Sequence, residues 1–283
     1  MSQISFLNGK FVAASQAKVS VYDRGFLFGD AVYEVIPIYQ SRPFRPQDHL
    51  DRLQNSLKAI ALKLDYCDKY WHALIDQMIK KNNGGNLSLY IQITRGSEIE
   101  RDHVGRADTE PTVLMMVSPL STEIASLTPI KTTLLPDIRW KNCFIKTTAL
   151  LGNVMLKQQA SQAGYEEAIL RRENIISEGT TSNVFMVKNG IIYTPIANQY
   201  ILAGITREVI IEIAENASIK VIQQNITVEQ LLDADEIWLS SSSREISPVT
   251  QIDDKIVAKG TIGPVTAKMH QLFQAFKRRL TGS

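Results

Sequence analysis

The chain has 283 residues, 44% hydrophobic and 21% charged, an ordinary globular composition that excludes a disordered, collagen-like or low-complexity protein. Its 31 basic and 29 acidic side chains give a formal charge of +2, which argues against a nucleic-acid or anionic-membrane surface. No secretory signal is visible, no apolar run approaches the roughly 18 residues that span a bilayer, and the two cysteines form no CxxC pair. We expect a cytoplasmic protein without membrane or nucleic-acid partners.

The first part of the chain alternates predicted strands and helices. Its β-branched and aromatic residues predict short strands over Phe6–Val12 and Val19–Val21 and a longer strand over Ala31–Tyr39. A leucine stripe at helical spacing follows Pro46, and Asp48 is the expected N-cap of that helix. The next predicted elements are a helix over Lys69–Lys81 and strands over Leu87–Thr94 and Thr112–Ser118.

A short polar stretch with a proline, residues 119–126, predicts a linker. It separates a smaller N-terminal domain, residues 1–118, from a larger C-terminal domain, residues 127–283. In the second domain, Ala149–Ala163 is predicted as a helix and Asn189-Gly190 as a hairpin turn between two strands. The remaining predicted elements are a helix capped by Thr206, a strand over Glu236–Leu239 and a helix over Pro264–Arg279. The expected fold class is mixed α/β (α+β) in two domains.

Several common functional motifs are missing from the sequence. There is no GxGxxG after a strand and no GxxxxGK[ST], so a dinucleotide or P-loop nucleotide site is not expected. The four histidines show no HExxH or similar spacing, so no metal site is predicted. A GxSxG nucleophile elbow is also absent, which argues against acyl transfer.

What remains is a set of polar clusters in the second domain. Lys146 stands between apolar residues just before a predicted helix; most lysines are solvated, but a buried one has a lowered pKa and a nucleophilic amine. Glu178 opens a run of small hydroxyl residues, and Gly204-Ile205-Thr206 begins a helix whose N–H groups favour an anion. Each feature alone is better explained as a surface or capping group. Together with the hydroxyls of Ser240–Ser243, they match what pyridoxal phosphate requires.

With these motifs in this order, the sequence resembles the class IV aminotransferases that use pyridoxal phosphate, and more narrowly the bacterial D-amino acid aminotransferases. The resemblance covers nearly the whole chain and implies the fold of the type IV pyridoxal-phosphate enzymes. The segments that carry it are Tyr22–Asp30 with Val32-Tyr33-Glu34, His49–Leu53, Asp137–Trp140 with Ile145-Lys146, Glu178–Phe185, Gly204–Arg207 and Glu245–Val249.

The resemblance implies pyridoxal 5'-phosphate as cofactor and assigns a role to each matching residue. Lys146 would be the catalytic Schiff-base lysine, and Glu178 would face the pyridine nitrogen and keep it protonated. Arg52 would bind the phosphate as a planar, permanently charged group. The other implied cofactor-binding residues are Ile205, Thr206, Ser242, Ser241 and Thr181.

The loop that contains Arg101-Asp102-His103 bears on the choice of substrate. It is similar to the Arg-x-His pair with which D-amino acid aminotransferases hold the substrate α-carboxylate, reaching from the neighbouring subunit of a homodimer. Tyr33 would supply a hydroxyl to the same carboxylate. Fixing the carboxylate decides which enantiomer presents its Cα–H to Lys146. The implied substrates are small amino and 2-oxo acids, with D-alanine and 2-oxoglutarate giving pyruvate and D-glutamate.

Three other functions stay open. An aminodeoxychorismate lyase and a branched-chain L-amino acid aminotransferase share this fold, but Arg101 and His103 argue against the lyase. A non-catalytic protein that binds pyridoxal phosphate would keep the fold without turnover. The intact pair of Lys146 and Glu178 argues against that protein.

Overall fold

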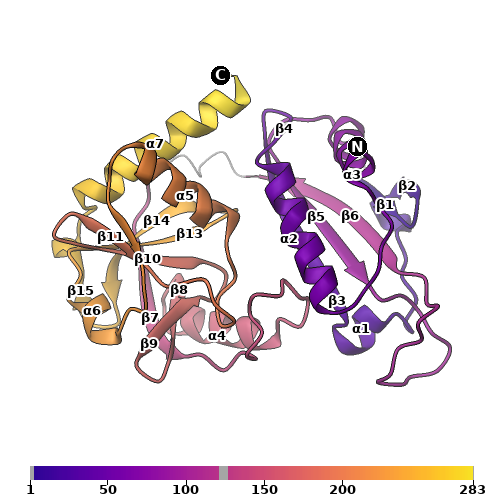
Figure 1. The fold of residues 1–283 in the computed structure, drawn as a ribbon, viewed down its shortest axis with the longest axis horizontal. Helices are drawn as coiled ribbons and strands as arrows, with labels where there is room; N and C mark the ends of the chain where they lie inside the picture. Colours follow the sequence, from indigo (N-terminus) through magenta and orange to yellow (C-terminus); the bar gives the residue numbers. More distant parts are fainter. Residues whose placement is uncertain (1–2, 121–126, 283) are drawn as a thin grey trace. The chain divides into compact units, whose positions relative to one another are not determined.

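The computed structural model describes residues 3–120 and 127–282, and the chain divides into two compact units (Figure 1). The first consists of Met1–Thr122 with Ile145–Leu150, and the second of Glu123–Phe144 with Leu151–Ser283. Of the predicted linker, residues 121–126 lie outside the described residues, Pro119 ends a strand, and Leu120 is buried.

The segment Ile145–Leu150 groups with the first unit, whereas the sequence placed it in the C-terminal domain. The reason is backbone pairing that no local pattern reveals. Thr147 forms a bridge to Val32, and the N–H of Thr148 donates to the carbonyl of Ala31 over 3.1 Å. Lys146 therefore belongs structurally to the first unit.

The first unit contains an antiparallel sheet with the strand order β2-β1-β6-β5-β3-β4. The pairing of β3 with β5 runs from Ala31 opposite Thr94 to Ile38 opposite Leu87, so both predicted strands are confirmed. The six strands are β1 (Ile4–Leu7), β2 (Lys10–Ala13), β3 (Ala31–Tyr39), β4 (Arg42–Pro43), β5 (Leu87–Thr94) and β6 (Thr112–Pro119).

The predicted strand Phe6–Val12 is wrong, because a turn interrupts it. Asn8 and Gly9 have φ values of 46° and 84°, so they form the two-residue turn between β1 and β2. Val19–Val21 is not a strand either, and the side chain of Val21 is 66% exposed. A β-branched residue favours a strand only where a neighbouring strand gives it a surface to pack on.

Two long helices share the apolar core of this sheet. Helix α2 (Pro46–Ala59) contributes Leu50, Leu53 and Leu57, and α3 (Asp68–Lys81) contributes Trp71. The prediction of Asp48 as N-cap is wrong, since Arg45 is the N-cap and Asp48 lies in the first turn. Proline at the first helical position needs no N–H partner, which lets the helix begin earlier. The two shorter helices of this unit are α1 (Arg24–Phe28) and a 3-10 turn (Ala14–Gln16).

The second unit is built on a larger mixed sheet with the order β12-β11-β10-β13-β14-β7-β8-β9, and β15 pairs with β14. Pairs β7–β8, β7–β14 and β11–β12 are parallel, and the others are antiparallel. The hairpin at Asn189-Gly190 is confirmed. The strands are β7 (Ile130–Pro136), β8 (Glu167–Arg172), β9 (Ile175–Gly179), β10 (Asn183–Lys188), β11 (Ile191–Thr194), β12 (Val221–Gln223), β13 (Glu236–Ser241), β14 (Glu245–Ile252) and β15 (Lys255–Ile256).

Helices α4, α5 and α7 pack against strands of this sheet, and the buried side chains of the second unit are mostly aliphatic and aromatic. The rings of Phe185 and Trp238 stack with centroids 5.2 Å apart. The predicted cap Thr206 is wrong, because Gly204 is the N-cap of α5 and Thr206 lies inside the helix. The helices are α4 (Leu151–Gln162), α5 (Ile205–Asn216), α6 (Val228–Leu232), α7 (Pro264–Thr281) and a 3-10 turn (Ala258–Gly260).

Candidate active site

Lys146 lies beside the first residues of β3. Its backbone N–H donates to Ser56 Oγ over 3.2 Å, and its carbonyl accepts from the N–H of Tyr33 over 2.9 Å. The side chain is half-buried, and its Nζ lies 4.3 Å from the centre of the Tyr33 ring. Lys146 and Tyr33 are therefore neighbours, and the backbone of Lys146 is held by the N–H of Tyr33 in β3 and the hydroxyl of Ser56 in α2.

Arg52 projects from α2 onto Glu34 of β3. Its Nε donates to Oε1 over 2.7 Å and its Nη2 to Oε2 over 2.9 Å, and Glu34 has no exposed surface. His49, one turn earlier in the helix, places Nδ1 2.8 Å from Oε2. The carboxylate thus fixes the direction of the guanidinium that the family resemblance assigns to the phosphate.

The cations around Glu34 and His49 lower the pKa of both side chains. For Glu34 this opposes the effect of burial, and for His49 it adds to it. Burial alone would raise the pKa of Glu34, but the positive Arg52 and the bonds from Arg52 and His49 hold it well below its usual range. Burial lowers the pKa of His49, and the cations Arg52 and Lys146 lower it further against the attraction of Glu34. Neutral His49 then donates from Nδ1 to an ionised Glu34.

The predicted substrate loop lies on Phe28, the last residue of α1. The guanidinium carbon of Arg101 is 4.7 Å from the Phe28 ring centre, and the rings of Phe28 and His103 are 5.3 Å apart. Tyr33 instead stacks on Tyr90 with centroids 5.6 Å apart. The first unit therefore holds its predicted substrate residues in two groups, one on Phe28 and one beside Lys146.

Glu178 is the penultimate residue of β9 in the second unit and is 5% exposed. Arg139 Nη1 donates to its Oε1 over 2.5 Å, while the N–H of Leu202 and the amide of Asn183 donate to Oε2 over 3.1 and 3.3 Å. Burial raises the pKa of Glu178, and the positive charge and hydrogen bond of Arg139 limit the rise. Every bond shown to this carboxylate is a donated one, which favours its ionised form.

Arg139 is a site residue to which the sequence assigned no role. It is 5% exposed and is itself held by Asp137, which accepts from its Nε over 2.9 Å and from its Nη2 over 2.8 Å. Arg172 also donates to Asp137, over 3.0 Å. The spacing Asp-x-Arg was the available signal, because an arginine two residues from an acid can form such a bidentate pair.

The start of α5 is open for an anion. Gly204 has no side chain to cap the helix, and the predicted residues Ile205 and Thr206 are buried in the first turn. A Cβ at position 204 would lie 2.1 Å from Asn183 Oδ1, so any side chain there would displace the amide of Asn183. The uncapped N–H groups and the helix dipole therefore remain for an outside acceptor.

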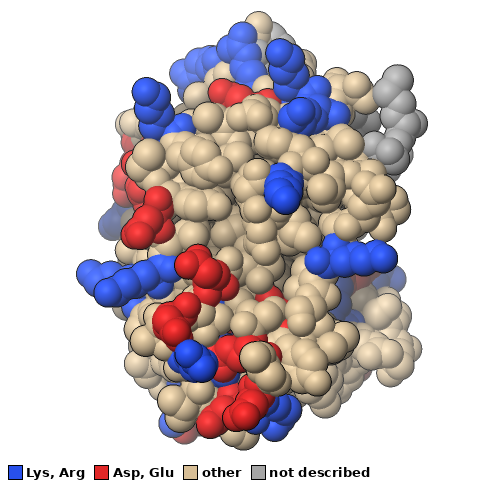
Figure 2. Space-filling view, turned by 90° about the vertical axis from the view of Figure 1, so that its right-hand side faces the viewer, with Lys and Arg blue, Asp and Glu red and all other residues tan. Residues whose placement is uncertain are grey.

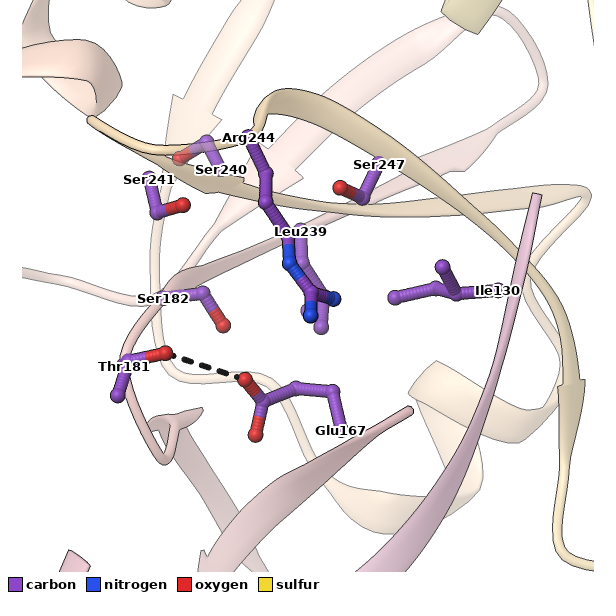
Figure 3. A pocket seen from close by; sticks show the side chains of 9 residues that line it. All are labelled: Ile130, Glu167, Thr181, Ser182, Leu239, Ser240, Ser241, Arg244 and Ser247. Carbon is purple, nitrogen blue, oxygen red and sulfur yellow. Dashed lines mark hydrogen bonds between the residues drawn. The ribbon is translucent and has the colours of Figure 1, made fainter. Parts of the chain in front are cut away.

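The serine run borders a pocket in the second unit (Figure 3). Thr181 and Ser241 both line it, and the Arg244 side chain extends from the turn between β13 and β14 toward its middle. The hydroxyls of Ser182 and Ser240 are buried there and have no hydrogen-bond partner within the described residues. Ser242, the first choice from the sequence, lies in that turn and is not part of the lining.

Within residues 3–120 and 127–282, no three or more His, Cys, Asp or Glu side chains are placed to hold a metal ion. None of the helices in this part of the chain is both long and apolar enough to cross a membrane.

Comparisons with known proteins identify the family. Residues 31–252 match the amino-transferase class IV family. A D-alanine aminotransferase of Staphylococcus epidermidis is 38% identical over 272 residues, 96% of each chain, and one of Listeria monocytogenes is 37% identical over 94% of this chain and 93% of its own. The structure of a branched-chain aminotransferase from Thermoproteus uzoniensis with norvaline superposes with a TM-score of 0.89 at 27% identity, covering 100% of this chain and 96% of that one. On fold, motifs and near-complete coverage, this chain belongs to the class IV aminotransferases.

Proposed function

We propose that this aminotransferase acts on D-amino acids and transfers the amino group of D-alanine to 2-oxoglutarate, giving pyruvate and D-glutamate. The observation that carries the proposal is the pairing of Arg101 and His103 on one ring, Phe28, which presents two cationic or donor groups together. An arginine binds a carboxylate with two parallel bonds and so fixes its orientation. The full-length likeness to D-alanine aminotransferases supports the same choice.

The side chains present fit pyridoxal 5'-phosphate as the cofactor. Ser240 offers a buried hydroxyl without a partner in the described part of the chain, and Glu178 is a buried acid held by donors. When bound, this cofactor supplies a protonated pyridine ring that takes up the electron pair left on the substrate Cα. The residues that we assign to hold it are Lys146, Glu178, Arg52, Ile205, Thr206, Ser241, Ser242 and Thr181.

The chain's own residues then perform four tasks. Lys146 Nζ removes the proton from the substrate Cα as a base and returns a proton as an acid. Glu178, oriented by Arg139, holds the proton on the ring nitrogen. Arg52, oriented by Glu34, binds the phosphate. Tyr33 and the Arg101-His103 pair bind the α-carboxylate.

A donor assay tests the reaction. Purified enzyme is supplied with 2-oxoglutarate and with D-alanine, L-valine or L-leucine, and the new oxo acid is measured. We expect activity with D-alanine and parallel lines in the double-reciprocal plot, because the first product, pyruvate, leaves before the second substrate, 2-oxoglutarate, binds. Activity confined to the L-donors would select the branched-chain function, which is that of the similar structure from Thermoproteus uzoniensis. Pyruvate released without any amino acceptor would select the lyase. A protein that shows cofactor absorbance but turns over none of these substrates would select the non-catalytic alternative.

The role of Lys146 has a separate test with a matched control. Lys146→Ala should lose turnover, and borohydride should no longer fix the cofactor to the chain, as read by mass spectrometry. Lys141→Ala removes an exposed lysine from the same segment and should behave as wild type. Cofactor fixed to the Lys146→Ala chain would refute the assignment.

We also propose a homodimer in which the Arg101-His103 loop completes the neighbouring subunit's site. The test mixes Lys146→Ala, which lacks turnover, with Arg101→Ala, which binds the carboxylate weakly, at a D-alanine concentration too low for either variant alone to show activity. If the loop serves the neighbour, a mixed dimer contains one site with both defects and one with neither, so activity returns. If the loop serves its own subunit, every site keeps one defect and the mixture stays inactive.

A further inference from the structure

The buried arginine Arg24, at the start of α1, has no role in the function described so far. Its side chain is 5% exposed. A buried guanidinium is costly unless acceptors surround it, so its partners reveal its purpose. Its Nε donates to Asp30 Oδ2 over 3.0 Å, and Nη1 reaches Glu98 Oε2 at 3.5 Å.

The two shortest remaining bonds of Arg24 go to the backbone of the substrate loop. Nη1 donates to the carbonyl of Asp102 over 2.6 Å, and Nη2 donates to the carbonyl of His103 over 2.9 Å. The first carbonyl belongs to the residue after Arg101, and the second belongs to His103 itself. The rigid fork of one guanidinium thus ties down two successive peptide groups of the Arg-x-His segment.

Phe28, at the other end of α1, holds the side chains of the same segment. Arg24 lies over its ring at 4.9 Å and Arg101 at 4.7 Å, while the His103 ring is 5.3 Å away. The loop also passes close to Arg24, since a Cβ at Gly105 would lie 3.1 Å from Arg24 Nε. The side chains and the backbone of the loop therefore both contact helix α1, through Phe28 and Arg24, and we call these two residues the anchor.

The anchor is itself fixed to the sheet. Asp23 has no exposed surface and accepts from the N–H of Gly25 over 2.8 Å, from Thr94 Oγ1 over 3.0 Å and from Thr112 Oγ1 over 2.7 Å. The N–H of Arg24 donates to the carbonyl of Gly96 over 2.8 Å. Helix α1 is therefore joined to the ends of β5 and β6, between which the loop runs.

The flanks of the loop are joined to each other through Glu98, whose Oε1 accepts from the N–H of Arg106 over 2.8 Å and from Thr109 Oγ1 over 2.9 Å. The tip between these flanks is open. Residues 100–104 are all exposed, and charged side chains of both signs crowd the lower part of the face in Figure 2. Arg106 pairs with Asp108, and both side chains are 72% exposed, a pair that contributes little order. Arg101–His103, at this tip, are held to helix α1 by the bonds from Arg24 and the packing on Phe28.

We propose that Arg24 is a positioning residue for substrate binding, which holds Arg101 and His103 in the orientation that receives the α-carboxylate. The inference rests on the proposed D-amino acid function. A loop that is competent for only a fraction of the time lowers the apparent affinity by that fraction. Arg101 and His103 would bind the substrate carboxylate in both the ground state and the transition state. Weaker binding of this carboxylate therefore raises KM and leaves kcat unchanged.

The test compares Arg24→Gln with Arg106→Gln, which removes an exposed guanidinium from the same loop. Arg24→Gln should raise KM for D-alanine about tenfold or more, with kcat within about twofold of wild type and unchanged cofactor absorbance. Arg106→Gln should match wild type. An Arg24→Gln enzyme with unchanged KM, or with a lowered kcat at unchanged KM, would overturn the proposal. Should this variant fail to fold, Arg24→Lys keeps the charge beside Asp30 but not the fork, and the same KM criterion applies.

Limited trypsin digestion separates this inference from the proposed function. Cleavage after Arg101 should be several-fold faster in Arg24→Gln than in wild type or Arg106→Gln, whatever the substrate is. Wild-type enzyme inactive on D-alanine, with accelerated cleavage in Arg24→Gln, would refute the proposed substrate but keep the anchoring role. Equal cleavage rates in wild type and Arg24→Gln would overturn the anchoring role itself.

Discussion

Glu34→Gln removes a fully buried negative charge and keeps the shape of the side chain. Glu34 accepts four bonds, two from Arg52 at 2.7 and 2.9 Å, one from His49 at 2.8 Å and one from the N–H of Val35 at 3.3 Å. The glutamine amide has only one acceptor oxygen, and its NH2 group would face a donor that Glu34 now accepts from. At least one hydrogen bond is therefore lost, and Arg52 loses the negative charge that it pairs with. Breaking a buried pair by removing one partner costs about 3–5 kcal/mol, the loss of unfolding free energy expected at pH 7.

The loss should depend on pH, with a sign fixed by the pKa of Glu34. Burial opposes ionisation, but Arg52 and His49 outweigh it and hold the pKa in the folded chain well below the ordinary value of 4.5. The unfolded chain therefore binds the proton first as pH falls. The stabilisation from Glu34 is complete above the unfolded pKa and declines below it, by about 1.4 kcal/mol per pH unit.

Urea unfolding of wild type and Glu34→Gln, followed from pH 7 to pH 3.5, measures this difference. We expect the gap between the two to be largest near neutral pH and to narrow below about pH 4.5. Asp108→Asn, which breaks an exposed pair, should unfold at the wild-type urea concentration throughout. Equal unfolding free energies at pH 7, or a gap that stays constant down to pH 3.5, would refute the reasoning.

Two further substitutions test the backbone at Gly96, where the loop begins, and the role proposed for Glu178. Gly96 has φ +102° and a Cβ there would lie 2.0 Å from the Glu110 carbonyl oxygen, so Gly96→Ala should cost more than the about 1–3 kcal/mol of backbone strain alone. Gly85→Ala, at φ +86° with open space around the Cβ, is the control; an equal drop in melting temperature for both would count against the clash. Arg139→Met should raise the pKa of Glu178 further, because it removes the positive charge that opposes the effect of burial. Cofactor absorbance after dialysis should then fall at a higher pH than in wild type, and an unchanged pH profile would contradict this role.

Local patterns predicted the strands and helices whose apolar residues recur at the period of that element. Strand β3 was predicted as Ala31–Tyr39 and β5 as Leu87–Thr94, because their side chains pack at the period of the pleat. The same reasoning failed at Phe6–Val12, where Asn8-Gly9 reverses the chain. The turn residues were visible there, but the flanking apolar residues suggested one continuous strand.

The caps show a second limit of local reasoning. Asp48 and Thr206 are both good capping residues by type, yet the helices begin earlier, at Pro46 and Ile205. In α5 the start is set by Gly204, which leaves room for Asn183 from a distant strand. A boundary decided by packing against a remote residue has no signature in its own neighbourhood.

The sequence by itself determined the family, the mixed α/β class, and the identity of the residues proposed to carry the chemistry, because these depend on residue types in a fixed order. Only the tertiary structure decided which groups orient them: Glu34 for Arg52, Arg139 for Glu178, and Arg24 for the Arg101-His103 loop. It also placed Lys146 with the first unit. The physical reason is common to all four: a buried charge or an unpaired backbone group must find its partner, and that partner can lie tens of residues away along the chain.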